Sequence, residues 1–477
     1  MAKILLPTKV NIIIDRLQLA GYEAYVVGGC VRDSLLGRIP EDWDITTSAK
    51  PQEVKSLFSH TVDTGIAHGT VTVLLGQEGF EVTTYRIDGE YEDMRHPKQV
   101  EFTSLLSLDL ERRDFTINAM AYNDSVGIVD LFGGMQDMEN HIIRCVGCAN
   151  DRFSEDALRI MRAVRFSAQL DFEITPDTLR AAASHAEELS HISAERIRVE
   201  LTKLLLSSHP ERLLTAQKIG LTAIFLPEFD RMLATTQENP HHIYNVGVHT
   251  IHALSYIAKK ETVSETTQDR HNSLALSKKE DVILRFALLL HDCAKPDTKS
   301  IDQDGRAHFY GHDYLGAAYS EEILRRLKFD NDTIREVSHL IKMHDTRYAD
   351  SGKTVRMRTV RRAVSRIGKE SLPLLFLLQE ADLNAQNPDL LPDKLRQLSE
   401  ARHMAEEILI KGECISLKDL AVNGSDLIAA GFPPGKKIGE CLKLLLDYVI
   451  EYPEYNQKEI LLLHMAELAN KINLQKM

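Results

Sequence analysis

The segment GGCVRDSLLGRIPEDWDITT, residues 28–47, places two glycines, an arginine and two carboxylates close together. Asp42 and Asp44 are spaced i, i+2, which on a strand points both carboxylates to one face. Two like charges held so close repel each other unless a cation lies between them, which indicates Mg²⁺. Gly28–Gly29 lets the backbone approach a ligand, and the guanidinium of Arg32 matches phosphate oxygens. Together these residues predict a metal–triphosphate site.

A third carboxylate decides between this prediction and its alternative, a glycine turn followed by two surface acids. The run EVTTYR reads as a strand, and on it Glu81 could bring its carboxylate to the same metals. Two-metal phosphoryl transfer needs such a cluster, because one ion lies at the attacking hydroxyl and the other on the triphosphate. We therefore predict Asp42, Asp44 and Glu81 as the catalytic residues.

Composition sets the class of protein. The chain has 477 residues, of which 43% are hydrophobic and 27% charged, as in a soluble protein of three or four domains. No signal-peptide pattern and no apolar run long enough for a membrane span occurs, so we expect a cytoplasmic protein without membrane contact. The six cysteines are widely spread, which predicts reduced thiols, and the Cys145/Cys148 pair lacks further zinc ligands. The net charge of −13 excludes a uniformly basic surface but not local RNA-binding patches.

The periodicity of the chain divides it into four segments. Residues 1–150 alternate helical and strand patterns, including a helix that stops at Gly21, a strand at 24–27 and a hairpin joined by residues 77–79. The rest is helical: a neck at 151–235, a histidine-rich segment at 236–390 and a tail at 391–477. The polar run at 259–280 is the best candidate for a mobile loop. We expect an α/β (α+β) head of five or so strands followed by mostly α-helical domains.

Five motifs in order resemble the class II tRNA nucleotidyltransferases, which are the CCA-adding enzymes and the related bacterial poly(A) polymerases. The motifs are GGCVRD, DWD, ERRDFTINAMAY (111–122), VDLFGG (129–134) and SEDALRIMRAVRF (154–166). The resemblance covers residues 25 to about 230, nearly half of the chain. It implies a nucleotidyltransferase head that adds C, C and A to tRNA 3′ ends from CTP and ATP without a template. An A-adding enzyme or a poly(A) polymerase is the nearest alternative.

The same resemblance implies roles for individual residues. Asp42 and Asp44 would bind the catalytic Mg²⁺ ions. The residues that would contact the nucleotide here are Gly28, Gly29, Arg32, Arg113, Asp114 and Asn118. The segment YEDMRHPKQVEF, residues 91–102, resembles the flexible loop of full CCA-adding members, which argues against a CC-only enzyme.

The segment SEDALRIMRAVRF also predicts a helix with its charges on one side. Asp156, Arg159, Arg162 and Arg165 recur every three residues, and Ser154 is the expected N-cap. Because this row follows a nucleotide site, we prefer a functional interpretation to that of a merely solvated face. The three guanidiniums would hold the triphosphate, and Asp156 with Arg159 would read the base. Cytosine and adenine both present an amino donor beside a ring-nitrogen acceptor, which a carboxylate and a guanidinium can recognise.

The histidine-rich segment carries separated residues of the kinds that bind metals. The run LRFALLLHDCAKP places His291 and Asp292 after apolar residues, so we expect this pair to end a buried helix. A buried aspartate is costly unless it is paired or binds a metal. The full set of candidates is His249, His291, Asp292, His312, His344 and Asp382.

This H…HD…H…H…D pattern resembles the HD superfamily of metal-dependent phosphohydrolases. The resemblance implies a divalent metal of unspecified identity, with a bound water as nucleophile, held by His249, His291, Asp292 and Asp382. His312 and His344 would bind phosphate or a second ion. The alternative is an HD domain that serves only as a scaffold. The histidines without such a context, expected in the core or on the surface, are His241, His242 and His252.

A basic helix lies between these ligands. Seven lysines or arginines fall between Lys353 and Lys369 without an acid. Those that share one helical face are Arg358, Arg361, Arg362, Arg366 and Lys369. They predict an RNA-phosphate track, with a merely soluble helix face as the alternative.

Two functions from other classes compete with nucleotide addition. One is an RNA-binding or regulatory protein with a dead catalytic centre, which the intact triad of Asp42, Asp44 and Glu81 argues against. The other is an HD nucleotide hydrolase with a regulatory head. The sequence predicts tRNA, CTP and ATP as partners and leaves the oligomeric state open.

Overall fold

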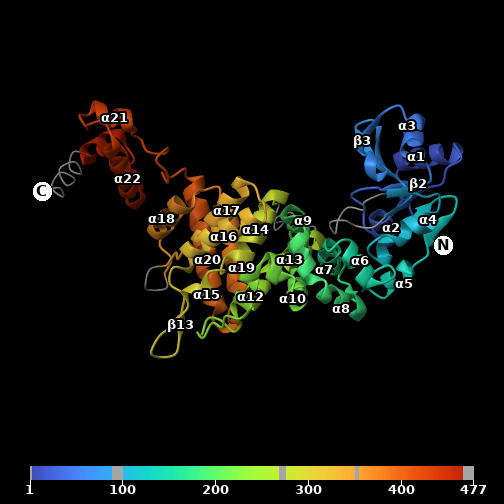
Figure 1. The fold of residues 1–477 in the computed structure, drawn as a ribbon. Helices are drawn as coiled ribbons and strands as arrows, with labels where there is room; N and C mark the ends of the chain where they lie inside the picture. The colour runs from blue at the N-terminus through green and yellow to red at the C-terminus, as the bar shows by residue number, and fades with distance from the viewer. Residues whose placement is uncertain (1–2, 89–99, 268–275, 350–353, 466–477) are drawn as a thin grey trace. The chain divides into compact units, whose positions relative to one another are not determined.

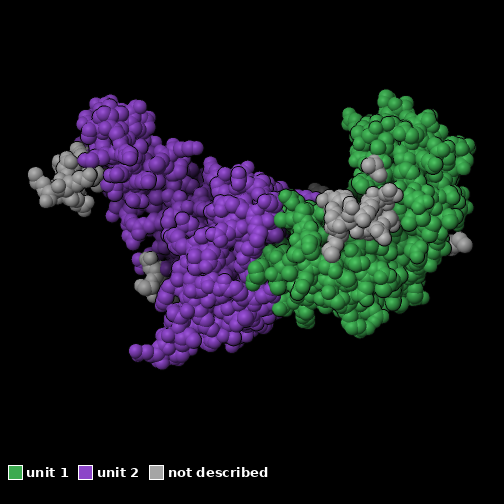
Figure 2. All heavy atoms as spheres, viewed as in Figure 1, with its two compact units in different colours: residues 1–227 green, residues 228–477 purple. Residues whose placement is uncertain are grey.

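The structure is a computed structural model, which describes residues 3–88, 100–267, 276–349 and 354–465. In it the chain separates into two units, residues 1–227 and 228–477, which Figure 2 draws in green and purple. The predicted α/β (α+β) head and the mostly helical character of the later segments are both confirmed (Figure 1). The finer division into four domains stays a prediction, and the loop predicted at 91–102 lies almost entirely outside the described residues.

A mixed sheet forms the head, with the strand order β3-β4-β5-β2-β1-β8-β9. Its seven strands exceed the predicted five or so, partly because the mostly exposed edge strand β3 carries a polar sequence, TVDTG. The strands are β1 Ala24–Val27, β2 Ile45–Thr47, β3 Thr61–Gly65, β4 Thr70–Leu75, β5 Glu78–Thr84, β8 Met120–Asn123 and β9 Gly127–Asp130. Among the pairs of this sheet, β2 and β5 run parallel, and this pairing sets two key acids side by side.

Short-range patterns account for several elements of the head. The predicted first helix is α1 Thr8–Leu19, which buries Val10, Ile13, Ile14 and Leu17. The predicted hairpin is β4–β5, with its turn at residues 76–77. The glycine pair begins α2 Gly29–Leu35, and Gly28 has a φ of 80°, which a residue without Cβ adopts at little cost. The other helices are α3 Pro51–Leu57, α4 Leu106–Glu111 and α5 Gly134–Glu139, and the two-stranded pairs are β6 Arg86–Asp88 with β7 Val100–Phe102, and β10 Ile142–Ile143 with β11 Glu173–Ile174.

The prediction that the arginine-bearing helix begins at Ser154 is wrong. Ser154 lies inside α6 Ala149–Glu155, and a new helix, α7, spans Leu158–Leu170. Asp156 has an extended backbone between the two, and its Oδ1 accepts a hydrogen bond from the Leu158 N–H at 3.0 Å. The remaining helices of this unit are α8 Pro176–Ser184, α9 Ala194–Leu205, α10 Leu213–Lys218 and α11 Thr222–Phe225, with α12 Pro227–Leu233 at the boundary.

The second unit is built almost entirely from helices. Helix α14 Lys278–Leu290 begins at a Ser277–Glu280 capping box, buries its apolar half and ends at His291, as predicted. The predicted loop at 259–280 is partly wrong, because α13 Val246–Thr267 continues into it, while residues 268–275 lie outside the described part. The other helices are α15 Lys295–Thr298, α16 His312–Arg326, α17 Asn331–Met343, α18 Met357–Ile367, α19 Leu372–Asn384, α20 Leu391–Ile410, α21 Gly424–Ala429 and α22 Lys436–Glu451, with one short hairpin, β12 Ser300–Ile301 and β13 Ala307–His308.

Two packing arrangements position the candidate residues. In the first unit α7 packs against α9, and in the second α13 and α14 pack against α19 and against each other. Among the described residues, no helix combines the length and the apolar character that crossing a membrane requires.

Candidate active site and buried histidine cluster

Three carboxylates converge at the start of strand β2. Asp44 directly precedes β2, whose parallel partner β5 places Ile45 opposite Val82 and therefore Asp44 beside Glu81. The prediction that Asp42 and Asp44 lie within a strand is wrong, because both precede β2, although the Asp44 carbonyl still accepts from the Val27 N–H at 3.0 Å. The structure thus brings together the three acids proposed from the sequence.

The electrostatics of these acids fit a cation. All three side chains keep contact with solvent, but the protein around Asp44 still desolvates its carboxylate, which raises the pKa, and Asp42 raises it further against the lowering effect of Arg113. Partial desolvation also raises the pKa of Glu81, and the charges of Asp44 and Asp42 add to this effect. A divalent cation would relieve this repulsion, and a donor set of oxygens alone suits a hard ion such as Mg²⁺.

A hydrogen-bonded chain links α2 to α7 next to the carboxylates. Arg32 Nη1 donates to Asn118 Oδ1 at 2.6 Å, and Asn118 Nδ2 donates to Asp114 Oδ1 at 3.1 Å. Arg162 Nε donates to Asp114 Oδ2 at 2.7 Å. Burial by itself would raise the pKa of Asp114, but the Arg162 guanidinium and the Asn118 amide hold it at about 2. Four residues predicted from three separate motifs therefore form one connected network.

Arg113 lies at the glycine turn. A Cβ added to Gly28 would lie 3.0 Å from its Nη1, so a larger residue would press on this guanidinium and shift it. Its Nη2 lies 3.4 Å from the fully buried Asp109, which also accepts hydrogen bonds from Arg112 at 2.7 Å and from Thr46 at 3.1 Å. Asp109 was not among the predicted residues, although an acid followed by arginines at i+3 and i+4 was a visible signal.

The prediction that Asp156 and Arg159 lie on one helical face is wrong, because Asp156 precedes α7 and has an extended backbone. Asp156 instead binds Arg196 of α9, with Arg196 Nη2 at 2.7 Å from Oδ2. Arg159 forms an ion pair with Glu155, and its Nη2 donates to the Arg112 carbonyl at 3.0 Å. The physical reason is the break between α6 and α7, which removes Asp156 from the helical face that carries the arginines. Arg196 was missed because it is 40 residues away in the sequence.

The other two arginines of the row are not a solvated face. Arg165 is only 6% exposed, and its Nε lies 2.6 Å from Glu200 of α9. Burial lowers the pKa of Arg165 to about 10, while the Glu200 carboxylate opposes that effect. Arg162 is shared between Asp114 and, at 3.9 Å, Glu200. The row therefore belongs to a network of buried and half-buried charges.

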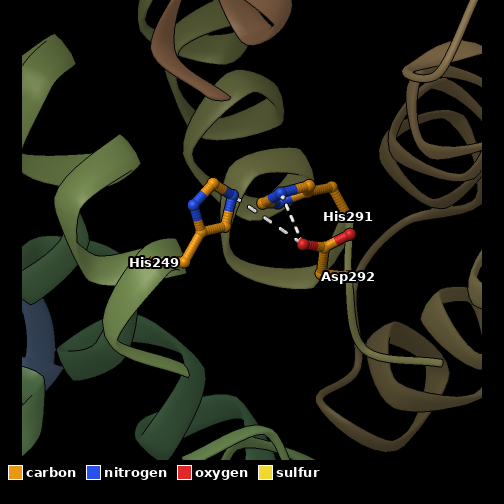
Figure 3. A group of neighbouring side chains, drawn as sticks. All are labelled: His249, His291 and Asp292. Atoms are coloured by element: carbon orange, nitrogen blue, oxygen red, sulfur yellow. Dashed lines mark ion pairs between the residues drawn. The ribbon is translucent and has the colours of Figure 1, made fainter. Parts of the chain in front are cut away.

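A second group of candidates meets inside the second unit (Figure 3). His249 comes from α13, while His291 and Asp292 follow the end of α14. The His291 and His249 Nε2 atoms lie 3.2 Å and 3.8 Å from Asp292 Oδ2. Asp382 of α19 completes the group, with its Oδ1 at 2.8 Å from His249 Nε2. These four residues are the ligand set that the HD resemblance implied.

The other two candidates face the opposite oxygen of the same aspartate. His312 Nε2 and His344 Nε2 lie 3.2 Å apart, and they lie 3.6 Å and 3.8 Å from Asp292 Oδ1. Asp292 therefore lies between two pairs of imidazoles, and each pair forms with it a group able to hold a metal ion.

Backbone carbonyls orient the four imidazoles. Each Nδ1 lies within hydrogen-bond distance of a main-chain oxygen, at 3.1 Å for His249, 2.7 Å for His291, 2.7 Å for His312 and 2.6 Å for His344. In a neutral imidazole, an Nδ1–H that donates to a carbonyl leaves Nε2 free to bind a metal, which is the arrangement of a metal-binding histidine. Burial lowers the pKa of His291, but Asp292 and Asp382 outweigh it and raise the pKa to about 10, so a metal would have to displace the proton on its Nε2.

Orphaned polar atoms support the fit to a metal. Within the described ranges, His291 Nε2 and both carboxylate oxygens of Asp292 are buried without a hydrogen-bond partner. Asp292 has a charged neighbour, because Lys295 Nζ forms an ion pair with its Oδ2 at 2.7 Å. Lys295 was not predicted, although its i+3 spacing from Asp292 is visible in the sequence. A mixed set of imidazole and carboxylate donors suits a transition metal better than Mg²⁺.

The cluster opens into a cavity of about 450 Å³ lined by Asp292, His312, His344 and Asp382. His241 and His242, which were expected only as core or surface histidines, also line this cavity. The His242 ring lies 5.1 Å from that of His249, and burial lowers the pKa of His242 to about 3. His252 does stay apart from the cavity lining and stacks on Tyr244.

The basic face of α18 is largely paired. Arg358 and Arg362 bind Glu451 at 2.5 Å and 2.6 Å, and Arg361 binds Glu413 at 2.5 Å. These acids belong to the C-terminal segment, so the predicted open track of positive charge is interrupted at three positions. The six cysteines are free thiols, as expected, and Cys145 is buried while Cys148 is exposed.

Three family models match the chain. They are the Poly A polymerase head domain at residues 24–144, the RNA and SrmB-binding site of polymerase A at residues 171–233, and domain 2 of the tRNA nucleotidyltransferases at residues 313–465. The matches cover the head, the neck and most of the second unit in the order expected for a nucleotidyltransferase.

Relatives and solved structures agree with these matches. A CCA-adding enzyme of Limosilactobacillus reuteri is 52% identical over 198 residues, which are 42% of this chain and 49% of the relative. The chain thus spans about half the length of this and similar curated relatives. A CCA-adding enzyme of Leuconostoc mesenteroides is 40% identical over 340 residues, which are 69% of this chain and 80% of the relative.

The fold is shared over almost the whole chain. The crystal structure of the Bacillus stearothermophilus CCA-adding enzyme in complex with CTP has a TM-score of 0.69 and 30% identity, and covers 99% of this chain and 100% of that one. The Thermotoga maritima CCA-adding enzyme complexed with tRNA has a TM-score of 0.58 at 21% identity. The match covers 97% of this chain and 96% of that one, so the two proteins share the fold. The identity to the Leuconostoc relative over most of its length and these matching folds place the chain in the family of CCA-adding enzymes.

Proposed function

We propose that the chain adds C, C and A to the 3′ end of tRNA, using CTP and ATP as substrates. The observation that carries this proposal is the convergence of Asp42, Asp44 and Glu81 beside the Arg32–Asn118–Asp114–Arg162 network. The names of the relatives support the same activity, since they are CCA-adding enzymes and one solved relative holds CTP.

The chain's own groups have distinct tasks in this reaction. Asp42, Asp44 and Glu81 would hold Mg²⁺, which when bound activates the attacking 3′ hydroxyl and neutralises the triphosphate. Arg32 and Arg113 lie at the glycine turn, where guanidiniums can bind phosphate oxygens. Gly28 and Gly29 leave room for that approach.

Base selection needs a rearrangement of existing pairs. Asp156 and Arg159 are the proposed base readers, but each already binds a protein partner, Arg196 and Glu155. The Asp156 carboxylate has free lone pairs beyond those that Arg196 uses, so it can accept from a base amino group while Arg196 stays bound. Arg159 must release Glu155 or share it.

The test is incubation of the purified chain with tRNA that lacks its CCA end. Each radiolabelled NTP is supplied alone and then in pairs, and the products are sized on a sequencing gel. We expect CTP alone to add two residues, and CTP with ATP to add three. Addition of a single A only to tRNA that already ends in CC would assign the A-adding alternative. A long A tract from ATP alone would assign a poly(A) polymerase.

We propose a metal-dependent phosphohydrolase activity at the histidine cluster as a second function. The observation that favours it is the set of four imidazoles whose Nδ1 atoms face carbonyls and whose Nε2 atoms surround Asp292. His249, His291, Asp292 and Asp382 would hold the first metal, and His312 with His344 would hold phosphate or a second ion. A divalent metal in such a site supplies a bound water of lowered pKa.

The hydrolase is tested on the full-length protein with a panel of phosphate esters, including 2′,3′-cyclic phosphates, in the presence of Mn²⁺, Co²⁺, Ni²⁺ or Mg²⁺. We expect hydrolysis of at least one ester that depends on the added metal. A protein that binds metal at the cluster and hydrolyses none of the panel would instead have a structural metal site.

A further inference from the structure

The ring of Phe166 lies at the centre of three guanidiniums. The Cζ of Arg165 lies 3.8 Å from the ring centroid, that of Arg32 lies 4.9 Å away and that of Arg162 lies 5.3 Å away. Arg32 comes from α2 in the head, whereas the other two share α7 with Phe166. One aromatic side chain thus joins the glycine-turn arginine to the arginines of the neck.

Three positive charges around one ring repel one another, so other interactions must offset this repulsion. The face of a benzene ring carries negative charge density, so each guanidinium within about 6 Å gains a cation–π interaction. Each arginine also forms an ion pair with its own carboxylate: Asp33 for Arg32, Asp114 for Arg162 and Glu200 for Arg165. The ring is the only group that contacts all three arginines among the interactions that the described residues make.

The ring acts without touching a ligand itself. Phe166 is 4% exposed and packs edge-to-face with Phe115, whose ring centroid lies 5.8 Å away at an angle of 82°. A nucleotide bound at the glycine turn therefore reaches Arg32 but not the Phe166 ring. Any effect of the ring on the nucleotide passes through the guanidiniums.

We propose that Phe166 is a positioning residue that holds Arg32, Arg162 and Arg165 together as one cluster of positive charge that attracts the triphosphate of the incoming nucleotide. The proposal rests on the proposed function, in which Arg32 binds phosphate oxygens, and on the sequence prediction that Arg162 and Arg165 act on the triphosphate. Because the triphosphate is common to all nucleotides, Phe166 sets affinity and leaves the choice of base to other residues. The reacting atoms are elsewhere, so the ring affects KM more than kcat.

The experiment changes the charge density of the ring while keeping its shape. Phenylalanine at position 166 is replaced by its 4-fluoro, 3,5-difluoro and 3,4,5-trifluoro analogues, together with Phe166→Leu and Phe166→Tyr. Binding of CTP and of inorganic tripolyphosphate is measured by calorimetry with Mg²⁺, and KM and kcat are measured for CTP and ATP. The matched control is Phe58, which is 5% exposed and carries a single guanidinium, Arg16, at 5.3 Å from its centroid.

We expect the dissociation constants of CTP and tripolyphosphate to rise stepwise with fluorination, by about two- to tenfold in total. KM should rise equally for CTP and ATP, with kcat changed less. Phe166→Tyr, which keeps an aromatic ring, should bind CTP and tripolyphosphate more tightly than Phe166→Leu. The same fluorination at Phe58 should leave binding unchanged. A flat fluorination series at Phe166, or a change matched by the Phe58 variants, overturns the proposal.

Failure of the proposed function gives a different result. If the wild-type chain adds no nucleotide, CCA addition is wrong, but the binding titrations still report on the ring. If the wild-type chain adds nucleotides and the fluorinated variants bind them equally well, CCA addition stands and Phe166 is only a core residue.

Discussion

The two candidate metal sites are built on opposite principles. In the head, three exposed carboxylates repel one another, and their donors are oxygens alone. In the second unit, four imidazoles surround a buried Asp292, and every imidazole is fixed by a backbone carbonyl. The first site is incomplete until a cation arrives, whereas the second is already arranged around the position of an ion.

Under the two proposals, the head would share its metal with a substrate, whereas the histidine cluster would keep its own. Exposed carboxylates bind Mg²⁺ weakly and rely on nucleotide phosphates for further ligands. Neutral imidazoles with fixed orientation bind transition metals tightly without a substrate. The two sites should therefore respond independently to substitution and to metal removal.

The largest expected effect is the loss of nucleotide addition in Asp44→Ala or Asp42→Ala. Removing a ligand of the cation that activates the 3′ hydroxyl should lower kcat by roughly a thousandfold or more. Binding of tRNA and hydrolysis at the histidine cluster should be unchanged. The control is Asp63→Ala, an exposed acid of the same unit that pairs with Lys55. Near-normal turnover in the Asp44 variant would show that the head metal is held elsewhere.

The second prediction concerns the aspartate shared by both halves of the histidine cluster. Asp292→Ala removes the carboxylate that both imidazole pairs face, so we expect loss of bound metal and of phosphate-ester hydrolysis, with CCA addition intact. Metal content and both activities are measured on one preparation. Asp332→Ala, an exposed acid of α17, serves as the control. Retention of metal by the Asp292 variant would contradict the assigned ligand set.

Dialysis compares the two sites within a single protein. After prolonged dialysis against metal-free buffer without chelator, we expect the histidine cluster to retain its metal and the head to retain none. Elemental analysis should find metal in wild type and in Asp44→Ala, but not in Asp292→Ala. Nucleotide addition should return at once when Mg²⁺ is added. Equal loss of metal from both sites would mean that preorganisation of the imidazoles gives no added affinity.

The Asp42/Asp44 pair and the His291–Asp292 pair could be predicted because their signals are local, whereas the other histidine-cluster residues came from the resemblance to the HD superfamily. Asp42 and Asp44 are two residues apart, and His291 with Asp292 follows an apolar run that can only be buried. The predictions that failed depended on how distant elements pack. A helix break at Asp156 removed this residue from the helical face that it was expected to share with Arg159, and Arg159 pairs with Glu155 instead.

Some functional residues were not predicted for the same reason, which is that their roles depend on how distant elements pack. His242 and Arg196 carry no local sign of their role, because the first reaches the cavity through tertiary packing and the second meets Asp156 from another helix. The basic face of α18 could be predicted, but not its neutralisation by Glu413 and Glu451, which comes from the fold of the C-terminal segment. Sequence periodicity predicts which side chains share one face of a helix, but it does not predict which residues pack against that face.

The smallest expected effects test whether nucleotide addition also relies on charge pairs of the neck that change partners when the substrate binds. Asp156→Ala removes a charged hydrogen bond to the base, worth roughly 1.5–3 kcal/mol, so kcat/KM for CTP and ATP should fall about 10- to 100-fold. The kcat/KM values for UTP and GTP should fall less, so the ratio of kcat/KM for CTP and ATP to that for UTP and GTP becomes smaller.

Arg196→Gln should act in the same direction but weakly. It removes the partner of Asp156 at 2.7 Å, and because both side chains are partly exposed, solvent screening limits the expected loss to about two- to fivefold. The control is Arg180→Gln, an arginine of α8 that is 72% exposed. The measurement is kcat/KM for the four NTPs with each variant. If Asp156→Ala is uniformly slower with an unchanged ratio while Arg196→Gln shifts the ratio, then Arg196 reads the base and Asp156 only holds it in place.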